Sequence, residues 1–218
     1  MYNDGEIVRI VLLSLRVSLL ATALAALVVL PMAFFLAMSE FRGRRAIVAC
    51  LNAFLSLPAV FIGLVVYMLL SRRGPLGSLG LLYTPSAMVV AQAVLAAPIL
   101  AAFFLSAFAS LSQSLKEQIL ALGASRRQLL FALLKEGRYG MMAAVIMGFS
   151  RVIGETGMTM MVGGNIRGYT RVMTTSIALG TMKGEFETSL VLGLILLAIS
   201  LALNIFFQVF QGGGRRVQ

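Results

Sequence analysis

Long apolar runs without charged residues constrain this chain more than any other feature of its sequence. Residues 17–39 and 46–71 contain no Asp, Glu, Lys or Arg. A helix needs about 20 mostly apolar residues to cross the roughly 30 Å of hydrocarbon in a bilayer, so both runs are long enough. Because the bilayer offers no water to backbone N–H and C=O groups, we expect these runs to be helical and the chain to be an all-α integral membrane protein.

Further apolar runs predict five transmembrane helices in total. Residues 71–86, after the second run, are rich in Gly, Pro and Ser, which is typical of a loop. The sequence shows no convincing internal repeat, so we expect one domain over residues 8–208. The predicted spans are 17–39, 46–71, 87–110, 139–162 and 187–210, with a cytoplasmic loop at 111–138.

The composition excludes several classes of function. The 218 residues are 60% hydrophobic and 12% charged, which excludes a soluble domain. The excess of 18 Lys and Arg over 8 Asp and Glu lies between apolar runs. It therefore indicates orientation in a membrane, and no nucleic-acid partner is expected. Histidine is absent and Cys50 is the single cysteine, so we expect no catalytic residues and no metal site.

The distribution of basic residues predicts the orientation. Segments 40–45, 111–138 and 211–218 hold ten Lys and Arg, and the segments on the opposite side hold six. Because basic loops stay in the cytoplasm, we expect the N-terminus outside and the C-terminus inside. The N-terminal residues are acidic before they are basic, which does not fit a cleaved signal peptide.

The charged segment between the third and fourth spans predicts two short helices. Ser114 with Glu117, and Ser125 with Gln128, both have the spacing of a capping box. Gly123 between them is placed to end the first helix in a left-handed turn. Each helix would have an apolar stripe, formed by Leu111, Leu115, Ile119 and Leu122 and by Leu129, Leu130, Leu133 and Leu134. Periodicity alone leaves open whether the pair lies on the membrane surface or docks a soluble protein.

The fourth span contains two charges. Arg151 and Glu155 are four residues apart, so they lie on one helix face and are expected to pair. A charge inside the bilayer requires a partner or a wet cavity. The pair either fixes helix packing or lines a substrate path. Gly140, Ala144 and Gly148 form a row of small residues on which another helix can pack closely.

The connection at 163–185 is rich in Gly and Thr and contains Arg167 and Arg171. Backbone amides, hydroxyls and guanidinium groups suit a tetrahedral oxyanion. The alternative, which we favour, is that this connection docks a binding protein or forms a gate.

Two motifs resemble a known family. Glu117 followed by Ala121, Gly123 and Ala124 resembles the Glu-Ala-Ala-x-x-x-Gly loop of ABC importer permeases, although Gln118-Ile119 replaces the two alanines. Lys135-Glu136 stands where many members have Leu-Pro, which predicts an unbroken run into the fourth span.

The segment GETGMTMMVGGNIRGYTRVMTTSIAL (154–179) closely resembles tungstate and molybdate permeases, and is nearest to the tungstate type.

This resemblance, which covers most of residues 117–203, implies a type-1 ABC importer permease fold (MetI-like) in the cytoplasmic membrane of a prokaryote. It implies a homodimer that translocates tungstate or molybdate, an ABC ATPase dimer, an extracytoplasmic substrate-binding protein and contact with membrane lipid. The chain lacks G-x-x-x-x-G-K-[ST], so ATP and Mg would be bound by the partner and the chain would be no enzyme itself.

The implied site residues form two sets. The ATPase-coupling set is Glu117, Ala121, Gly123, Ala124, Arg126 and Arg127. The translocation path or gate set is Arg151, Glu155, Thr156, Gly157, Asn165, Arg167, Thr170 and Arg171.

Three rival functions stay open. The substrate of an ABC permease could be another oxyanion, such as sulfate or phosphate. A proton-coupled secondary transporter would use Glu155, but a single buried carboxylate and the lack of a repeat are against it. A membrane scaffold without transport does not account for charges in the middle of a span.

Overall fold

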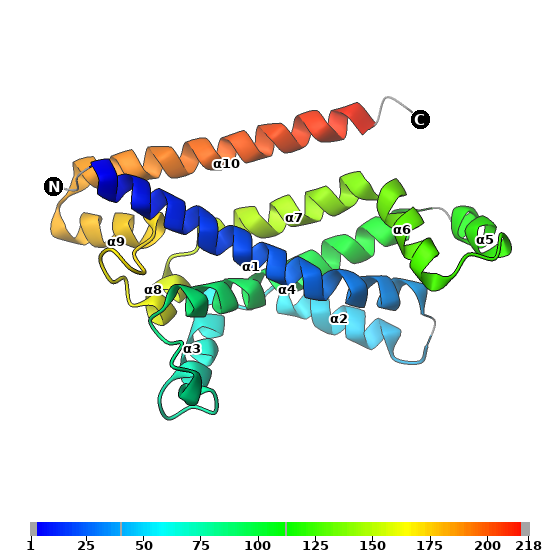
Figure 1. The fold of residues 1–218 in the computed structure, drawn as a ribbon, viewed down its shortest axis with the longest axis horizontal. Coiled ribbons are helices and arrows are strands. Elements are labelled where there is room, and N and C mark those ends of the chain that lie inside the picture. Colours follow the sequence, from blue (N-terminus) through cyan, green and yellow to red (C-terminus); the bar gives the residue numbers. More distant parts are fainter. Residues whose placement is uncertain (1–3, 40, 112, 215–218) are drawn as a thin grey trace.

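The computed structural model describes residues 4–39, 41–111 and 113–214, and in these ranges the regular structure is helical throughout. The helices form a bundle that is elongated along one direction (Figure 1). Their bounds are α1 (Asp4–Met38), α2 (Arg44–Phe54), α3 (Ala59–Leu70), the 3-10 turn η1 (Gly77–Leu79), α4 (Pro85–Ser110), α5 (Gln113–Ala121), α6 (Arg126–Glu136), α7 (Arg138–Ile153), α8 (Gly157–Gly163), α9 (Met173–Lys183) and α10 (Phe186–Gly214).

The core lies between α1, α4 and α7. On α1 a stripe of mostly small residues at four-residue spacing is buried, while the opposite side exposes Leu20, Leu24 and Leu27. Small residues let helix backbones approach closely, and an exposed leucine face suits lipid. From α4, Leu100, Phe104 and Phe108 are completely buried. The stripe on α1 consists of Val17, Ala21, Ala25, Val29 and Ala33.

The row of small residues on α7 packs against α4, as predicted. A Cβ atom on Gly140 would lie 2.9 Å from the Cβ of Ala107, and one on Gly148 would lie 3.1 Å from Cδ2 of Leu100. Ala144 between them is fully buried. The absence of larger side chains therefore sets the spacing of α4 and α7.

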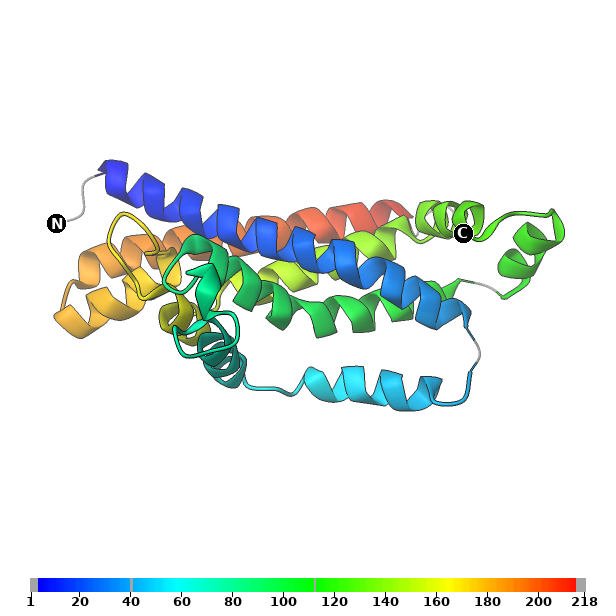
Figure 2. The same ribbon diagram turned by 60° about the horizontal axis from the view of Figure 1, so that its bottom comes forward.

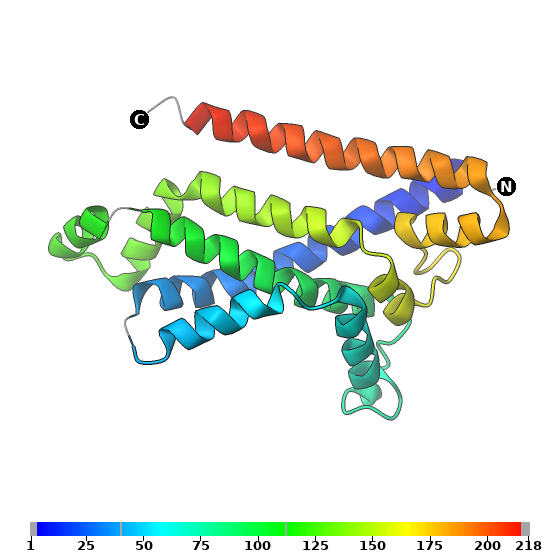
Figure 3. The same ribbon diagram turned by 180° about the vertical axis from the view of Figure 1, so that it is seen from behind.

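The predicted second span is broken. Residues 46–71 form α2 and α3, which are bent by 98° across a short break (Figure 3). Pro58 precedes α3 with an extended ψ of 129°. Proline has no N–H and disfavours helical geometry in the residue before it, which accounts for the break. Pro31 and Pro98, by contrast, lie inside unbroken helices.

The predicted fourth span is also broken, because α7 ends at Ile153 and residues 154–156 separate it from α8. The unbroken run that was predicted from the charged segment into the fourth span is likewise interrupted, because Gly137 separates α6 from α7. The connection at 163–185 contains the helix α9, which folds back against α10 (Figure 1).

Among the described residues, three helices are long and apolar enough to cross a membrane, and the bent pair α2–α3 could form a fourth. The three are Gly5–Met38, Pro85–Ala109 and Phe186–Phe206. The first begins well before the predicted residue 17, so it includes Arg9 and Arg16. The remaining predicted crossing falls on α7 and α8.

Candidate functional site

The residues predicted as functional lie at opposite ends of the molecule. The α5–α6 pair, here called the tip (residues 113–136), projects at one end (Figure 2). The segment after α8, here called the arginine loop (residues 164–172), lies at the other end, near the start of α1 (Figure 1). The two predicted sets are therefore separated by the length of the bundle.

The tip has the predicted turn at Gly123. This glycine has a φ of +78°, in the left-handed region. Its N–H donates to the carbonyl of Leu120 (2.9 Å), and the N–H of Ala124 donates to the carbonyl of Ile119 (3.4 Å). These two bonds satisfy the last carbonyls of α5 in the manner of a Schellman turn.

The second capping box is confirmed. The Ser125 N–H donates to Oε1 of Gln128 (2.8 Å), and the Gln128 N–H donates to Oγ of Ser125 (3.3 Å). The first box stays a prediction: α5 begins at Gln113, one residue before Ser114. The side chains of Ser114 and Arg126 lie outside the described residues.

The two helices of the tip differ in how they bury their apolar stripes. Leu129 and Leu133, from the predicted apolar stripe of α6, are buried against the core. On α5 the predicted stripe divides, because Ile119 packs on the core while Leu122 is 87% exposed. Phe131 of α6 is 70% exposed. Of the predicted coupling residues, Ala124 is half-buried, and the exposed ones are Glu117, Ala121, Gly123 and Arg127.

Arg151 and Glu155 form the predicted ion pair at the other end. Nη1 of Arg151 lies 3.0 Å from Oε2 of Glu155, with side chains 43% and 12% exposed. The Glu155 carbonyl accepts hydrogen bonds from the hydroxyls of Thr159 and Thr174, both at 3.0 Å. Its carboxylate accepts the Met158 N–H at 3.4 Å. Glu155 therefore joins α7, α8 and α9 at the break.

Glycines allow α8 to approach α3 closely. Gly157 follows Thr156 at the start of α8, and a Cβ there would lie 3.2 Å from Cγ2 of Val60. From the α3 side, a Cβ on Gly63 would lie 2.9 Å from Cα of Met158. The two helices after the breaks thus pack on each other.

The arginine loop is fixed mainly by its own side chains. Thr170 is buried, and its hydroxyl donates to the carbonyl of Gly163 (2.6 Å) and accepts the Ile166 N–H (2.9 Å). Nε of Arg171 donates to Oδ1 of Asn165 (3.3 Å) and Nη2 to its carbonyl (3.3 Å). Asn165 has a φ of +50°. The Thr170 hydroxyl and the Asn165 amide therefore hold the shape of the loop.

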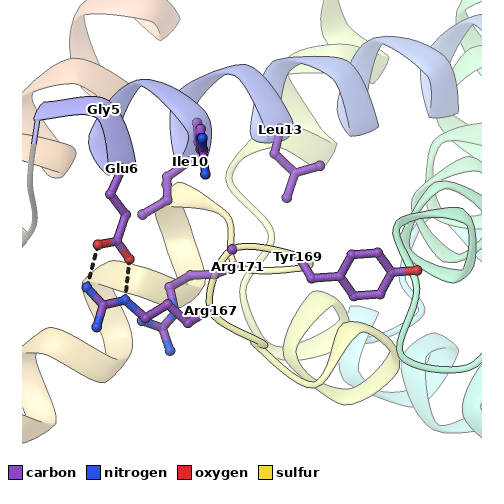
Figure 4. A pocket seen from close by; sticks show the side chains of 9 residues that line it. Gly5, Glu6, Ile10, Leu13, Arg167, Tyr169 and Arg171 are labelled. Carbon is purple, nitrogen blue, oxygen red and sulfur yellow. Dashed lines mark hydrogen bonds and ion pairs between the residues drawn. The ribbon is translucent and has the colours of Figure 1, made fainter.

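Arg167 reaches across to the start of α1. Its Nε and Nη2 donate to the two carboxylate oxygens of Glu6, both at 2.6 Å (Figure 4). Beside this pair is a pocket of about 500 Å³ between α1 and the arginine loop. Its lining residues are Gly5, Glu6, Arg9, Ile10, Leu13, Arg167, Gly168, Tyr169 and Arg171.

The sequence predictions missed Glu6, Arg9 and Tyr169. Glu6 and Arg9 are three residues apart on one helix, which is a visible signal. They were overlooked because the first span was expected to start at residue 17, whereas α1 starts at Asp4.

Tyr83 supports the other side of the arginine loop. Its ring lies against Gly164, where an added Cβ would be 2.8 Å from Cδ1, and its N–H donates to the carbonyl of Val162 (2.8 Å). The Tyr83 hydroxyl donates to the Tyr67 hydroxyl at 3.4 Å. This hydrogen bond raises the pKa of the Tyr83 hydroxyl.

Comparison with known proteins finds permease proteins of anion transport systems. The tungstate uptake system permease protein TupB of Peptoclostridium acidaminophilum is 42% identical over 92% of this chain and 88% of its own length. A probable anion ABC transporter permease protein of Haloferax volcanii is 38% identical over 93% of this chain and 89% of its own. The molybdenum transport system permease protein ModB of Azotobacter vinelandii is 30% identical over 76% of each.

A solved structure shares the fold. A chain of the MetNI methionine ABC transporter, in inward-facing conformations, superimposes with a TM-score of 0.75 at 20% identity, over 95% of this chain and 99% of that one. The type-1 (MetI-like) permease fold is thereby confirmed. The family model described as "Binding-protein-dependent transport system inner membrane component" matches residues 29–214. The chain is therefore a multi-pass inner-membrane transport subunit, and it belongs to this family of ABC importer permeases.

Proposed function

We propose that this chain is the permease subunit of an ATP-driven importer whose substrate is tungstate. The main evidence for tungstate as the substrate is the 42% identity to a tungstate uptake permease over nearly the whole chain. A second tungstate uptake permease, from Campylobacter jejuni, is 38% identical, whereas the molybdenum permease of Azotobacter vinelandii is 30% identical. Molybdate is the next candidate.

The tip is the proposed docking element for the ATPase. Leu120, Leu122 and Phe131 expose large apolar side chains there. Apolar groups at the end of a protein that faces water indicate a protein partner. Residues 114–127, with Glu117 and Gly123, would fit the ATPase, which binds ATP and Mg.

The orientation and assembly belong to the same proposal. The C-terminal end of α10 and the start of α2 lie toward the tip, and the N-terminal end of α1 lies toward the arginine loop (Figures 1 and 3). The described parts of the segments predicted as cytoplasmic thus lie at one end, which supports a cytoplasmic tip. Two copies around a two-fold axis would enclose the path, and the binding protein would dock at the arginine loop.

The structure suggests how ATP binding would reach the gate. Leu129 and Leu133 bury α6 against the core, and only Gly137 separates α6 from α7. α7 then spans about 24 Å at 1.5 Å per residue and ends beside Arg151 and Glu155. Closure of the ATPases would move the two tips together and shift the dimer toward an outward-open state. Thr156, Gly157 and the arginine loop would form the gate.

Transport by reconstituted vesicles tests the proposal. Vesicles that contain the permease and its ATPase should take up tungstate only when ATP and the loaded binding protein are present. Vesicles with the permease alone and a proton gradient are the control for the rival function, in which Glu155 carries protons. Uptake driven by the gradient alone would overturn the proposal in favour of a secondary transporter.

A further inference from the structure

The pocket between α1 and the arginine loop carries an excess of positive charge. Three arginines (Arg9, Arg167 and Arg171) and one carboxylate (Glu6) line it, which leaves a formal charge of +2. The remaining lining includes the apolar Ile10 and Leu13 and the ring of Tyr169. A volume of about 500 Å³ is larger than a small oxyanion needs. Such a pocket suits a doubly charged anion that keeps part of its hydration shell.

The guanidinium groups are already positioned to bind an oxyanion. Arg167 holds the two oxygens of Glu6 through two parallel N–H donors at 2.6 Å, the fork geometry in which arginine also binds tetrahedral oxyanions. Arg171 is oriented by its bonds to Asn165. Figure 4 shows Arg167 directed at Glu6, with Arg171 beside it. The Glu6 carboxylate thus occupies a place that an oxyanion would fill.

We propose that this pocket is a binding site for a tetrahedral dianion on the permease, and that the anion displaces Glu6 from Arg167. The proposal rests on the proposed function, because it assigns a place to the substrate anion on the outer side of this subunit. Displacement would break the ion pair that links the first turns of α1 to the arginine loop. The bond from the Met173 N–H to Oγ of Ser14 (2.8 Å) would still hold α1 to α9.

A tryptophan in the pocket makes the binding measurable. The sequence contains no tryptophan, so Tyr169→Trp introduces a single reporter beside the arginines. The full-length permease would be placed in nanodiscs of phosphatidylcholine and titrated with sodium tungstate. We expect a saturable change in tryptophan emission. The matched reporter Leu79→Trp, at an exposed position outside this pocket, should show none.

Charge variants identify the groups that bind the anion. In the Tyr169→Trp background, Arg9→Gln should weaken tungstate binding about tenfold or more, because it removes a cationic partner of the anion. Glu6→Gln should tighten binding several-fold, because the competing carboxylate is lost. Arg73→Gln, an exposed arginine outside the pocket, is the control and should change binding less than twofold.

The outcomes separate this site from other sources of negative charge and from the proposed function. The emission could change in nanodiscs that contain phosphatidylglycerol and not change when tungstate is added. That result would mean that the pocket binds a lipid headgroup, and it would overturn the proposal. So would tungstate binding that is indifferent to both Arg9→Gln and Glu6→Gln. If either result came from a permease whose complex still imported tungstate with ATP, the proposed function would stand and the pocket would not.

Discussion

At the scale of single residues, position 123 requires glycine because of its backbone conformation alone. Its φ is +78° and no atom lies within 4 Å of an added Cβ, so a side chain is excluded by strain rather than by a clash. Gly123→Ala should strain the turn by about 1–2 kcal/mol and reduce stimulated ATPase activity. Gly123→Pro should abolish it, because proline fixes φ near −65°. ATPase activity of the reconstituted complex with loaded binding protein is the measurement.

Gly184 supplies the control for this turn. It has a φ of +77° and equally open surroundings, but it caps α9 at the opposite end. Gly184→Ala should carry the same local cost and leave the ATPase stimulation close to wild type. Normal transport by a well-inserted Gly123→Pro permease would show that the tip does not couple to the ATPase.

Glu155 is a second residue whose role a single substitution decides. Its carbonyl, which Glu155→Gln keeps, accepts both threonine bonds, so the fold should survive the change. The lost ion pair involves an arginine that is 43% exposed, and exposed pairs contribute about 1 kcal/mol or less. A pair that only fixes helix packing predicts that ATP-driven uptake falls by about fivefold at most, the factor to which about 1 kcal/mol corresponds. A loss of a hundredfold or more in uptake assays would show that the charge itself takes part in transport.

At the scale of helices, the close packing of α4 and α7 depends on a glycine that faces a side chain unable to move away. Gly140→Ala places a Cβ 2.9 Å from that of Ala107, which has no rotamer to move away, so α4 and α7 must separate. We expect a net destabilisation of about 1–3 kcal/mol, measured as a lower Tm of the permease in detergent.

Gly193→Ala in α10 is the matched control, because nothing lies within 4 Å of its added Cβ. Here the better helix propensity of alanine should leave Tm unchanged or raise it slightly. Equal Tm changes in the two variants would mean that the α4–α7 contact does not limit stability.

At the scale of the whole molecule, the two exposed ends should lie on opposite sides of the membrane. Cys50 is the single native cysteine, so Cys50→Ala gives a background without thiols. In it, Met182→Cys should react with an impermeant thiol reagent in intact cells. Leu122→Cys should react only after permeabilisation. Both native side chains are among the most exposed, at 79% and 87%. Labelling in the reverse order would invert the predicted orientation.

By itself, the sequence determined the features that depend on neighbours along the chain. Apolar runs specified membrane helices, because burying backbone groups in lipid requires hydrogen bonds within each segment. The Ser125 capping box and the Gly123 turn were predicted correctly, because their bonds join residues at most five apart. The Arg151–Glu155 pair was predicted for the same reason, since its members are only four residues apart.

The tertiary structure decided where helices break and which distant residues meet. Pro31 and Pro98 lie in helices packed along each other, whereas α2 has no buried residue to hold it in line with α3 beyond Pro58. The three prolines look alike in sequence because their packing partners lie far along the chain. Glu6 and Arg167 are 161 residues apart, so no local pattern could join them. The arginine pocket exists only because the fold brings the first turn of α1 to the arginine loop.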